Sequence, residues 1–224
     1  MEIVAAGGRL RREGIALAVA SAAGAASAMG GHFDVDDAAV LAPERCQIEL
    51  WTTGGESARA WHAGPACRLG AVELGLILDQ VSTGERRDPV AGAQLKWVGA
   101  WLPRVEGVVV VAAARNTTRG ESLVTAYVPV TWSVSAALQL HANLGVDRTG
   151  GSAHTRRLGA AGEWALDHRV TLLAERFRTF GVVATRLGLR VALGEQTSVD
   201  LSGARVSGSG NRVWGLGWNW EFGR

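Results

Sequence analysis

The sequence has no apolar run of the roughly 20 residues that a membrane-spanning helix needs. It contains only two cysteines and five histidines among 224 residues, without metal-ligand spacing, and no phosphate-binding glycine loop before a helix. Its formal charge is only +2, which gives no support for nucleic-acid binding. We therefore expect no metal, no cofactor and no nucleic-acid partner.

The composition that remains is unusual for a water-soluble domain. Hydrophobic residues make up 47% of the chain, charged residues only 20%, and glycine occupies 30 positions. The length suits one domain. The apolar residues must therefore be distributed differently from those of an ordinary globular core.

The first residues have the pattern of a secretory signal peptide. Arg9, Arg11 and Arg12 precede the apolar run 14–25, and the small residues Ala26-Ser27-Ala28 follow it. A retained N-terminal anchor is the weaker interpretation, because the run is short and rich in alanine. We predict that residues 1–28 are a signal peptide and that the mature chain begins at Met29.

After Cys46 the sequence alternates between apolar and polar residues in segments of about ten residues. For example, Leu138, Leu140 and Leu144 alternate with His141 and Asn143. This is the period of a tilted membrane-spanning strand, and it predicts an all-β fold, a transmembrane antiparallel up-and-down β-barrel over residues 46–224. Dividing the chain at its turns gives about twelve strands, with ten as the alternative, near 46–53, 58–68, 71–82, 92–102, 107–116, 122–133, 136–147, 156–166, 169–178, 181–193, 196–206 and 211–222.

The expected connections alternate between short and long. With the N-terminus in the periplasm, the short ones fall on the periplasmic side and the long ones outside, as in bacterial barrels. The connections expected to be long are Thr83 to Gly92, Asn116 to Ser122, Asp147 to Thr155 and Ser207 to Asn211.

The tryptophans favour a membrane barrel over a soluble β-sandwich. Most fall near strand ends, as expected for aromatic girdles at the lipid headgroups, whereas a sandwich core would place them mid-strand. Trp97 is expected well inside its strand, and Trp51 has the parity of the polar face. The expected girdle residues are Trp51, Trp61 and Trp214 at the outer ends, and Trp101, Trp132, Trp164, Trp218 and Trp220 at the periplasmic ends.

The two cysteines flank a segment that can fold back at residues 53–57. In that hairpin Cys46 lies opposite Cys67, with Ile48 facing Pro65. Export to an oxidising compartment would allow a disulfide between them. Two unpaired buried thiols are the alternative.

The last strand has one wholly aromatic or aliphatic face. It resembles the C-terminal recognition strand of outer-membrane barrels, in which a glycine is followed by two aromatic residues, here Gly217, Trp220 and Phe222. The resemblance implies recognition by the barrel-assembly machinery. Gly223 and Arg224 follow the final aromatic residue, unlike a strictly terminal aromatic. A buried last strand of a soluble fold is the alternative.

An acidic N-terminal segment, residues 29–45, precedes the first strand and is expected in the periplasm or tucked into the barrel. The stretch from Phe33 to Glu49 contains Asp36-Asp37 and Pro43. It resembles the opening of the MetA-pathway family of outer-membrane transporters, which is associated with bacterial phenol and hydrocarbon degradation. The family usually has Thr where this chain has Val35. A metal site at His32, Asp34 and Asp36 is less favoured than a solvated tail.

Polar residues of the strands define the expected lumen. They form either a water-filled conduit or a salt-bridged core that closes the barrel. By parity the candidates are Glu49, Glu73, Asp79, Lys96, His141, Asn143, Arg157, Glu163, Glu175, Arg186, Arg190, Asp200 and Glu221.

We therefore predict a passive transporter or channel in the Gram-negative outer membrane for small, aromatic or apolar compounds. Its expected partners are outer-membrane lipid, the barrel-assembly machinery and a small solute. A structural or interaction barrel with a closed lumen is the alternative. An outer-membrane hydrolase using His141 is the second alternative, but no serine has a matching position beside His141 and Asn143, so we expect no catalytic residues.

Overall fold

The computed structural model describes residues 32–223, apart from the side chains of Val98, Ala100 and Trp101. The predicted signal peptide and its cleavage after Ala28 lie outside the described residues. None of the described residues belongs to a helix long and apolar enough to cross a membrane.

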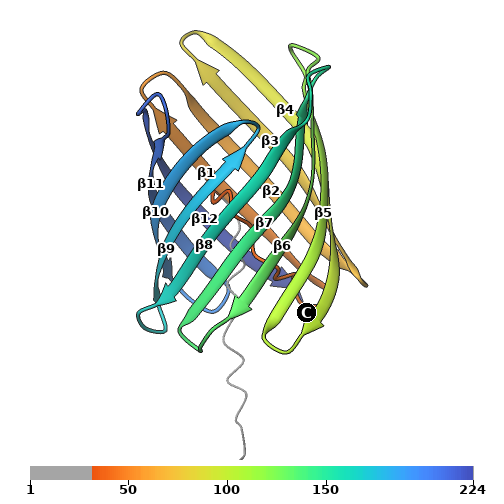
Figure 1. The fold of residues 1–224 in the computed structure, drawn as a ribbon, viewed down its shortest axis with the longest axis vertical. Coiled ribbons are helices and arrows are strands. Elements are labelled where there is room, and N and C mark those ends of the chain that lie inside the picture. The colour runs from red at the N-terminus through yellow and green to blue at the C-terminus, as the bar shows by residue number, and fades with distance from the viewer. Residues whose placement is uncertain (1–31, 224) are drawn as a thin grey trace, which may run out of the picture.

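Twelve strands form one closed antiparallel barrel, in which each strand pairs with its sequence neighbours and β1 closes on β12 (Figure 1). This confirms the predicted barrel and the count of twelve rather than ten. The strands are β1 Arg45–Gly55, β2 Arg59–Leu69, β3 Val72–Thr83, β4 Arg86–Leu102, β5 Val105–Asn116, β6 Ser122–Ser133, β7 Leu138–Thr149, β8 Thr155–Ala165, β9 Val170–Thr179, β10 Val182–Ala192, β11 Thr197–Val206 and β12 Arg212–Gly223.

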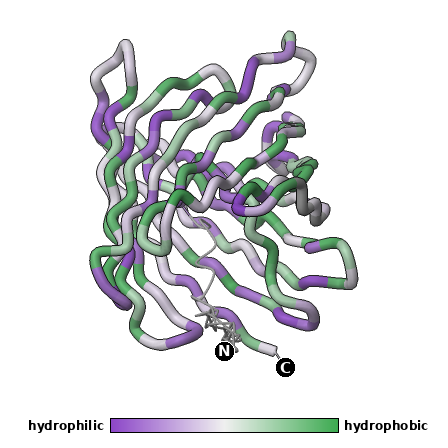
Figure 2. Tube along the Cα trace, turned by 60° about the horizontal axis from the view of Figure 1, so that its bottom comes forward, coloured by the Kyte–Doolittle hydropathy of each residue, from purple (hydrophilic) through white to green (hydrophobic). Residues whose placement is uncertain are grey.

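The alternation of polar and apolar residues along each strand explains why the sheet closes into a barrel. In β7, His141 and Asn143 point inward and are buried, whereas Leu140 and Leu144 are exposed on the outer face. Hydrophobic and hydrophilic positions alternate in this way along much of the sheet (Figure 2). A closed sheet leaves no unpaired strand edge, so an apolar outer face can meet lipid with its backbone groups paired.

The two ends of the barrel differ slightly in their connections. At the end where β1 begins and β12 ends, the five connections have two to four residues. At the opposite end, three of the six connections have five residues. Short turns are periplasmic in bacterial barrels, so we call the first end periplasmic and the second extracellular.

The long connection expected from Thr83 to Gly92 is wrong. Strand β4 already begins at Arg86, and only Gly84 and Glu85 separate it from β3. Gly84 adopts a positive φ of 61°, which permits the tight turn. The polar residues that suggested a loop instead extend the hairpin, with Arg87 opposite Ser82.

Two tryptophans depart from the simple girdle pattern. Trp51 points into the barrel and stacks on His62, with ring centroids 4.7 Å apart. Trp97 lies opposite Val72, the first residue of β3, and so lies nearer the periplasmic end than its sequence position indicates. Its ring is exposed on the outer face. The place of the Trp101 side chain stays a prediction.

The hairpin of β1 and β2 has the expected register and disulfide. Cys46 pairs with Cys67, Ile48 with Pro65 and Leu50 with Ala63. The two cysteines are joined by a disulfide across a sequence separation of 21 residues. The structure thus contains the predicted bond.

Candidate functional site

The described part of the acidic segment runs inside the barrel rather than along its outside (Figure 1). We call residues 32–41 the lumen segment. Phe33 and Val35 pack with Leu173 and Phe177 of β9 in one apolar cluster. Ala38 packs in a second cluster with Val108, Val110 and Tyr127. The inward face of the barrel is therefore partly apolar where the segment crosses it.

Glycines on the strands make room for the first side chains of the lumen segment. A Cβ atom at Gly188 would lie 2.6 Å from the Phe33 ring, and one at Gly159 would lie 2.6 Å from Val35. At Gly215 and Gly217 it would lie 2.7 and 2.9 Å from the His32 ring. Heavy-atom contacts this short are sterically unfavourable. These glycines therefore form a surface shaped to the segment.

Asp34 lies beside a buried arginine on β10. Arg186 contacts the Asp34 carboxylate at 3.0 Å and the Glu175 carboxylate at 3.0 Å, and it also donates to the His32 carbonyl. Glu175 in turn accepts the backbone N–H of Val35 at 2.8 Å. Both charge and backbone hydrogen bonding thus hold this part of the segment.

Asp36 binds strands on the other side of the lumen from Arg186. Its carboxylate lies 3.2 Å from Lys96 Nζ and accepts a hydrogen bond of 3.1 Å from the Tyr127 hydroxyl. With its amide oriented to satisfy both partners, Asn143 donates to the Asp36 carbonyl at 2.8 Å and accepts from the Asp36 N–H at 2.7 Å. Asp34 and Asp36 together anchor the segment to strands on both sides of the lumen.

The end of the segment is held through its backbone. Thr131 Oγ1 accepts the Ala38 N–H at 2.8 Å and lies 2.9 Å from His141 Nδ1. Glu73 accepts the Leu41 N–H at 2.9 Å, and Arg68 donates to the Leu41 carbonyl at 2.8 Å. His141 therefore supports the docking of the segment, and its side chain is fully buried.

Other lumen residues bind one another across neighbouring strands. Arg190 makes two hydrogen bonds to Asp200, at 2.7 and 2.8 Å, and Asn219 donates to the same carboxylate at 2.9 Å. Arg157 contacts Asp147 at 3.3 Å and lies over the Tyr127 ring at 4.3 Å. Such networks cross-link neighbouring strands, β10 to β12 in the first case and β7 to β8 in the second.

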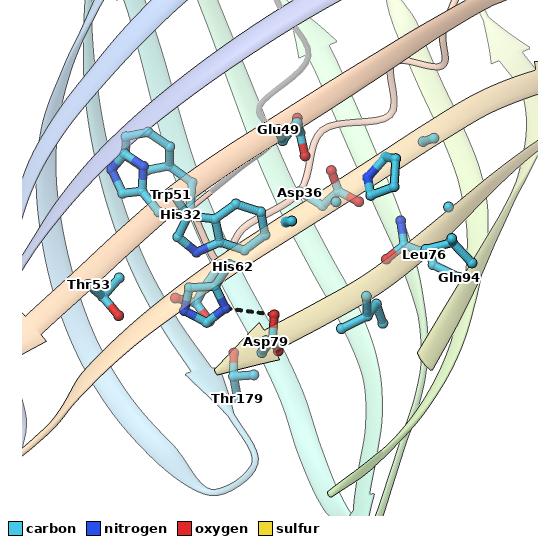
Figure 3. A pocket seen from close by; sticks show the side chains of 18 of the residues that line it. His32, Asp36, Glu49, Trp51, Thr53, His62, Leu76, Asp79, Gln94 and Thr179 are labelled. Atoms are coloured by element: carbon cyan, nitrogen blue, oxygen red, sulfur yellow. Dashed lines mark hydrogen bonds and ion pairs between the residues drawn. The ribbon is translucent and has the colours of Figure 1, made fainter. Parts of the chain in front are cut away.

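A cavity of about 520 Å³ remains between the lumen segment and the strands β1 to β3. The stacked Trp51 and His62 lie at it, and His62 Nδ1 donates to Asp79 at 2.8 Å (Figure 3). Five carboxylates line the cavity: Asp34, Asp36, Glu49, Glu73 and Asp79. Its two arginines, Arg157 and Arg186, each contact a carboxylate. The cavity is thus polar, partly aromatic and rich in acidic groups.

His32 is a buried titratable residue of the lumen segment, and no hydrogen bond from residues 32–223 stabilises its ring. Neither ring nitrogen has a hydrogen-bond partner among the described residues. Burial lowers the pKa of His32 to about 4, although Asp200 opposes this shift. Docking therefore favours the neutral imidazole.

The structure buries ten of the thirteen candidate lumen residues and leaves Glu49, Asp79 and Glu221 partly exposed. Glu163 lies 3.8 Å from His141, and Glu221 lies 3.8 Å from Arg45 at the periplasmic end. Among residues 32–223, no group of three or more His, Cys, Asp or Glu is arranged to hold a metal. Sequence parity did not identify Tyr127, Phe33 or the lumen glycines Gly159 and Gly188 as parts of the site.

Comparison with known structures finds outer-membrane β-barrels. The KdgM porin matches with a TM-score of 0.67 at 9% identity, over 79% of this chain and 99% of that one. The COG4313 outer membrane channel from Pseudomonas putida F1 matches with a TM-score of 0.60 at 10% identity, over 83% and 98%. The NanC porin matches with a TM-score of 0.59 at 7% identity, over 78% and 98%. At these identities the likeness establishes the fold.

The comparison with curated proteins finds no match. The resemblance to the MetA-pathway family therefore stays a prediction. A family model does match residues 16–222, which is nearly the whole chain. The chain thus belongs to the family described as uncharacterised conserved protein UCP029691, and its fold is that of an outer-membrane β-barrel.

Proposed function

We propose that the protein is a passive outer-membrane channel for small solutes, in which the lumen segment forms the constriction. The observation that supports this most directly is the cavity of about 520 Å³ beside the segment. A lumen filled only to close the barrel has no need of such a space. The porin-like neighbours are consistent with the same role.

We further propose that the solutes are small aromatic or apolar compounds, with cationic ones preferred over anionic ones. Trp51 and His62 present stacked rings to the cavity, and Phe33 and Tyr127 also line it. The five lining carboxylates outnumber the two lining arginines, and this excess of acidic groups disfavours anions. The KdgM porin, by contrast, has a structure in complex with an oligogalacturonate, an acidic sugar.

The competing function is a structural or interaction barrel whose lumen stays closed. The observation that favours it is the density of ion pairs around the lumen segment, in which half-buried Asp34 and Asp36 contact the buried Arg186 and Lys96. The two functions differ in whether any solute crosses the barrel.

Liposome swelling separates the two functions. The purified, folded chain is placed in vesicles, and the swelling rate is measured with a neutral, a cationic and an anionic solute of equal size. The channel predicts swelling above that of empty vesicles, fastest with the cationic solute. Swelling equal to that of empty vesicles with all three solutes contradicts the channel and supports the closed barrel.

We propose no enzymatic activity. A hydrolase would need an accessible nucleophile activated by a histidine, whereas His141 is buried beneath the lumen segment beside Thr131. If the purified chain hydrolysed phospholipid, and if His141→Ala abolished that hydrolysis, the absence of enzymatic activity would be contradicted.

We also propose that the barrel-assembly machinery recognises the last strand through Gly217, Trp220 and Phe222. The rings of Trp218, Trp220 and Phe222 stack in succession along β12, with Trp220 and Phe222 centroids 4.8 Å apart. Gly217 also has a second role, because it makes room for His32. Delayed assembly of Phe222→Ala in cells, with normal export, is the expected result.

A further inference from the structure

The extracellular end of the barrel has a row of arginines on its outer face. The strand registers place Arg176 opposite Thr185, Thr185 opposite Arg205, and Arg205 opposite Arg212. We call these four residues the arginine row. All four are exposed, and they share the outward parity of Leu187, Leu201 and Trp214. The row therefore crosses β9 to β12 on the lipid-facing side.

The arginine row lacks compensating carboxylates. Within residues 32–223, none of its three arginines makes an ion pair, although Arg176 donates to the Thr185 hydroxyl at 2.9 Å. Like charges directly opposite each other destabilise a sheet. Arg205 and Arg212 are such a pair, so an anion between them would remove an unfavourable interaction.

Membrane energetics fix the depth of the row. An arginine on the lipid face costs about 2–4 kcal/mol at the bilayer midplane and about 0–1 near the interface. The row lies at the extracellular ends of its strands, and the apolar residues Leu187 and Trp214 lie further toward the periplasm. The guanidinium groups therefore sit at the headgroup level of the outer leaflet.

Two apolar grooves flank the row. One, of about 530 Å³, is lined by Leu187, Gly203 and Trp214 together with Arg205 and Arg212. The position of a Cβ at Gly203 has no heavy atom within 4 Å, so the floor of this groove is open. The other, of about 330 Å³, is lined by Leu158, Ala160 and Val183 together with Arg176 and Arg178. Each groove thus joins a cationic rim to an apolar floor.

We infer that the arginine row and its grooves bind the phosphorylated glycolipid of the outer leaflet, lipid A. Arginine binds phosphate oxygens through pairs of parallel N–H donors, which suits a headgroup phosphate placed between Arg205 and Arg212. The acyl chains would lie in the grooves against Leu187 and Leu158. This site faces lipid and is independent of any passage through the lumen.

The test measures lipid A binding by the folded full chain in detergent micelles, using native mass spectrometry. The variant is Arg176→Gln with Arg205→Gln and Arg212→Gln. The matched control is Arg104→Gln with Arg169→Gln, two exposed arginines in periplasmic turns. The triple variant loses the charge-assisted hydrogen bonds to the lipid phosphates. Its Kd for lipid A should therefore be about tenfold higher than that of wild type, or more. The control should bind like wild type.

The lipid itself provides a test that needs no variant. Wild-type protein should bind dephosphorylated lipid A and phosphatidylglycerol at least about tenfold more weakly than lipid A. Equal binding of either lipid overturns the inference, and so does a triple variant that migrates as a folded barrel and binds lipid A like wild type. Inhibition of binding by inorganic phosphate alone at equal concentration would also contradict it, because the grooves would then contribute nothing.

Discussion

At the scale of single residues, shape complementarity between strand glycines and the lumen segment sets its position. We expect Gly188→Ala to displace Phe33, because the added Cβ would lie 2.6 Å from the ring, and overpacking of this kind costs about 1–3 kcal/mol. The measurement is thiol labelling of a cysteine placed at Ala39. Labelling should be faster in Gly188→Ala than in Gly203→Ala, where the Cβ meets open space. Equal labelling rates would refute the role of Gly188.

His32 makes the docking of the lumen segment sensitive to acid. Its pKa is about 4 when docked, below the ordinary value of 6.5, so the undocked segment binds the proton more readily. Docking is therefore stable above pH 6.5 and weakens as the pH falls toward 4. The same labelling assay should accelerate across this window in wild type, and less in His32→Gln. The pKa of His32 also depends on the charges of Asp200, Arg186 and Arg190. If the His32→Gln variant has the same pH profile as wild type, the acid sensitivity does not come from His32.

At the scale of strands, much of the architecture could be predicted because alternation and turns are local signals. The hairpin of β1 and β2 has the predicted register. The polar residues Arg86 and Arg87 indicate a loop by composition, yet the β3–β4 ladder continues through them to the pair of Thr83 with Arg86. The sequence does not reveal the role of the lumen glycines, because a glycine has no side chain whose polarity would show which face it lies on. Their role depends on a segment that is more than 100 residues distant in sequence.

The disulfide belongs to the same scale. We expect no free thiol in the denatured, unreduced protein, because Cys46 and Cys67 are joined. Cys46→Ala with Cys67→Ala should lower the temperature at which the barrel loses its folded gel migration, since a bond closing a loop of 21 residues contributes about 3 kcal/mol in the chain-entropy account. Two reactive thiols in the native sequence would contradict the bond.

At the scale of the whole molecule, the barrel surrounds a segment that it holds by apolar packing, backbone hydrogen bonds and two charged contacts to its aspartates. The partners on the barrel wall, Arg186 and Lys96, are buried, whereas Asp34 and Asp36 are half-buried. The pairs of Asp34 with Arg186 and of Asp36 with Lys96 join the lumen segment to opposite sides of the wall. We therefore expect the width of the passage to depend on those two aspartates.

Single-channel conductance in planar bilayers tests this dependence most directly. Wild type should show small openings, and Asp34→Asn with Asp36→Asn should conduct several-fold more. Asp167→Asn, in the turn between β8 and β9, is the control and should conduct like wild type. Thiol labelling first establishes that the lumen segment is released in the double variant. If that variant then conducts no more than wild type, the lumen segment does not set the width of the passage.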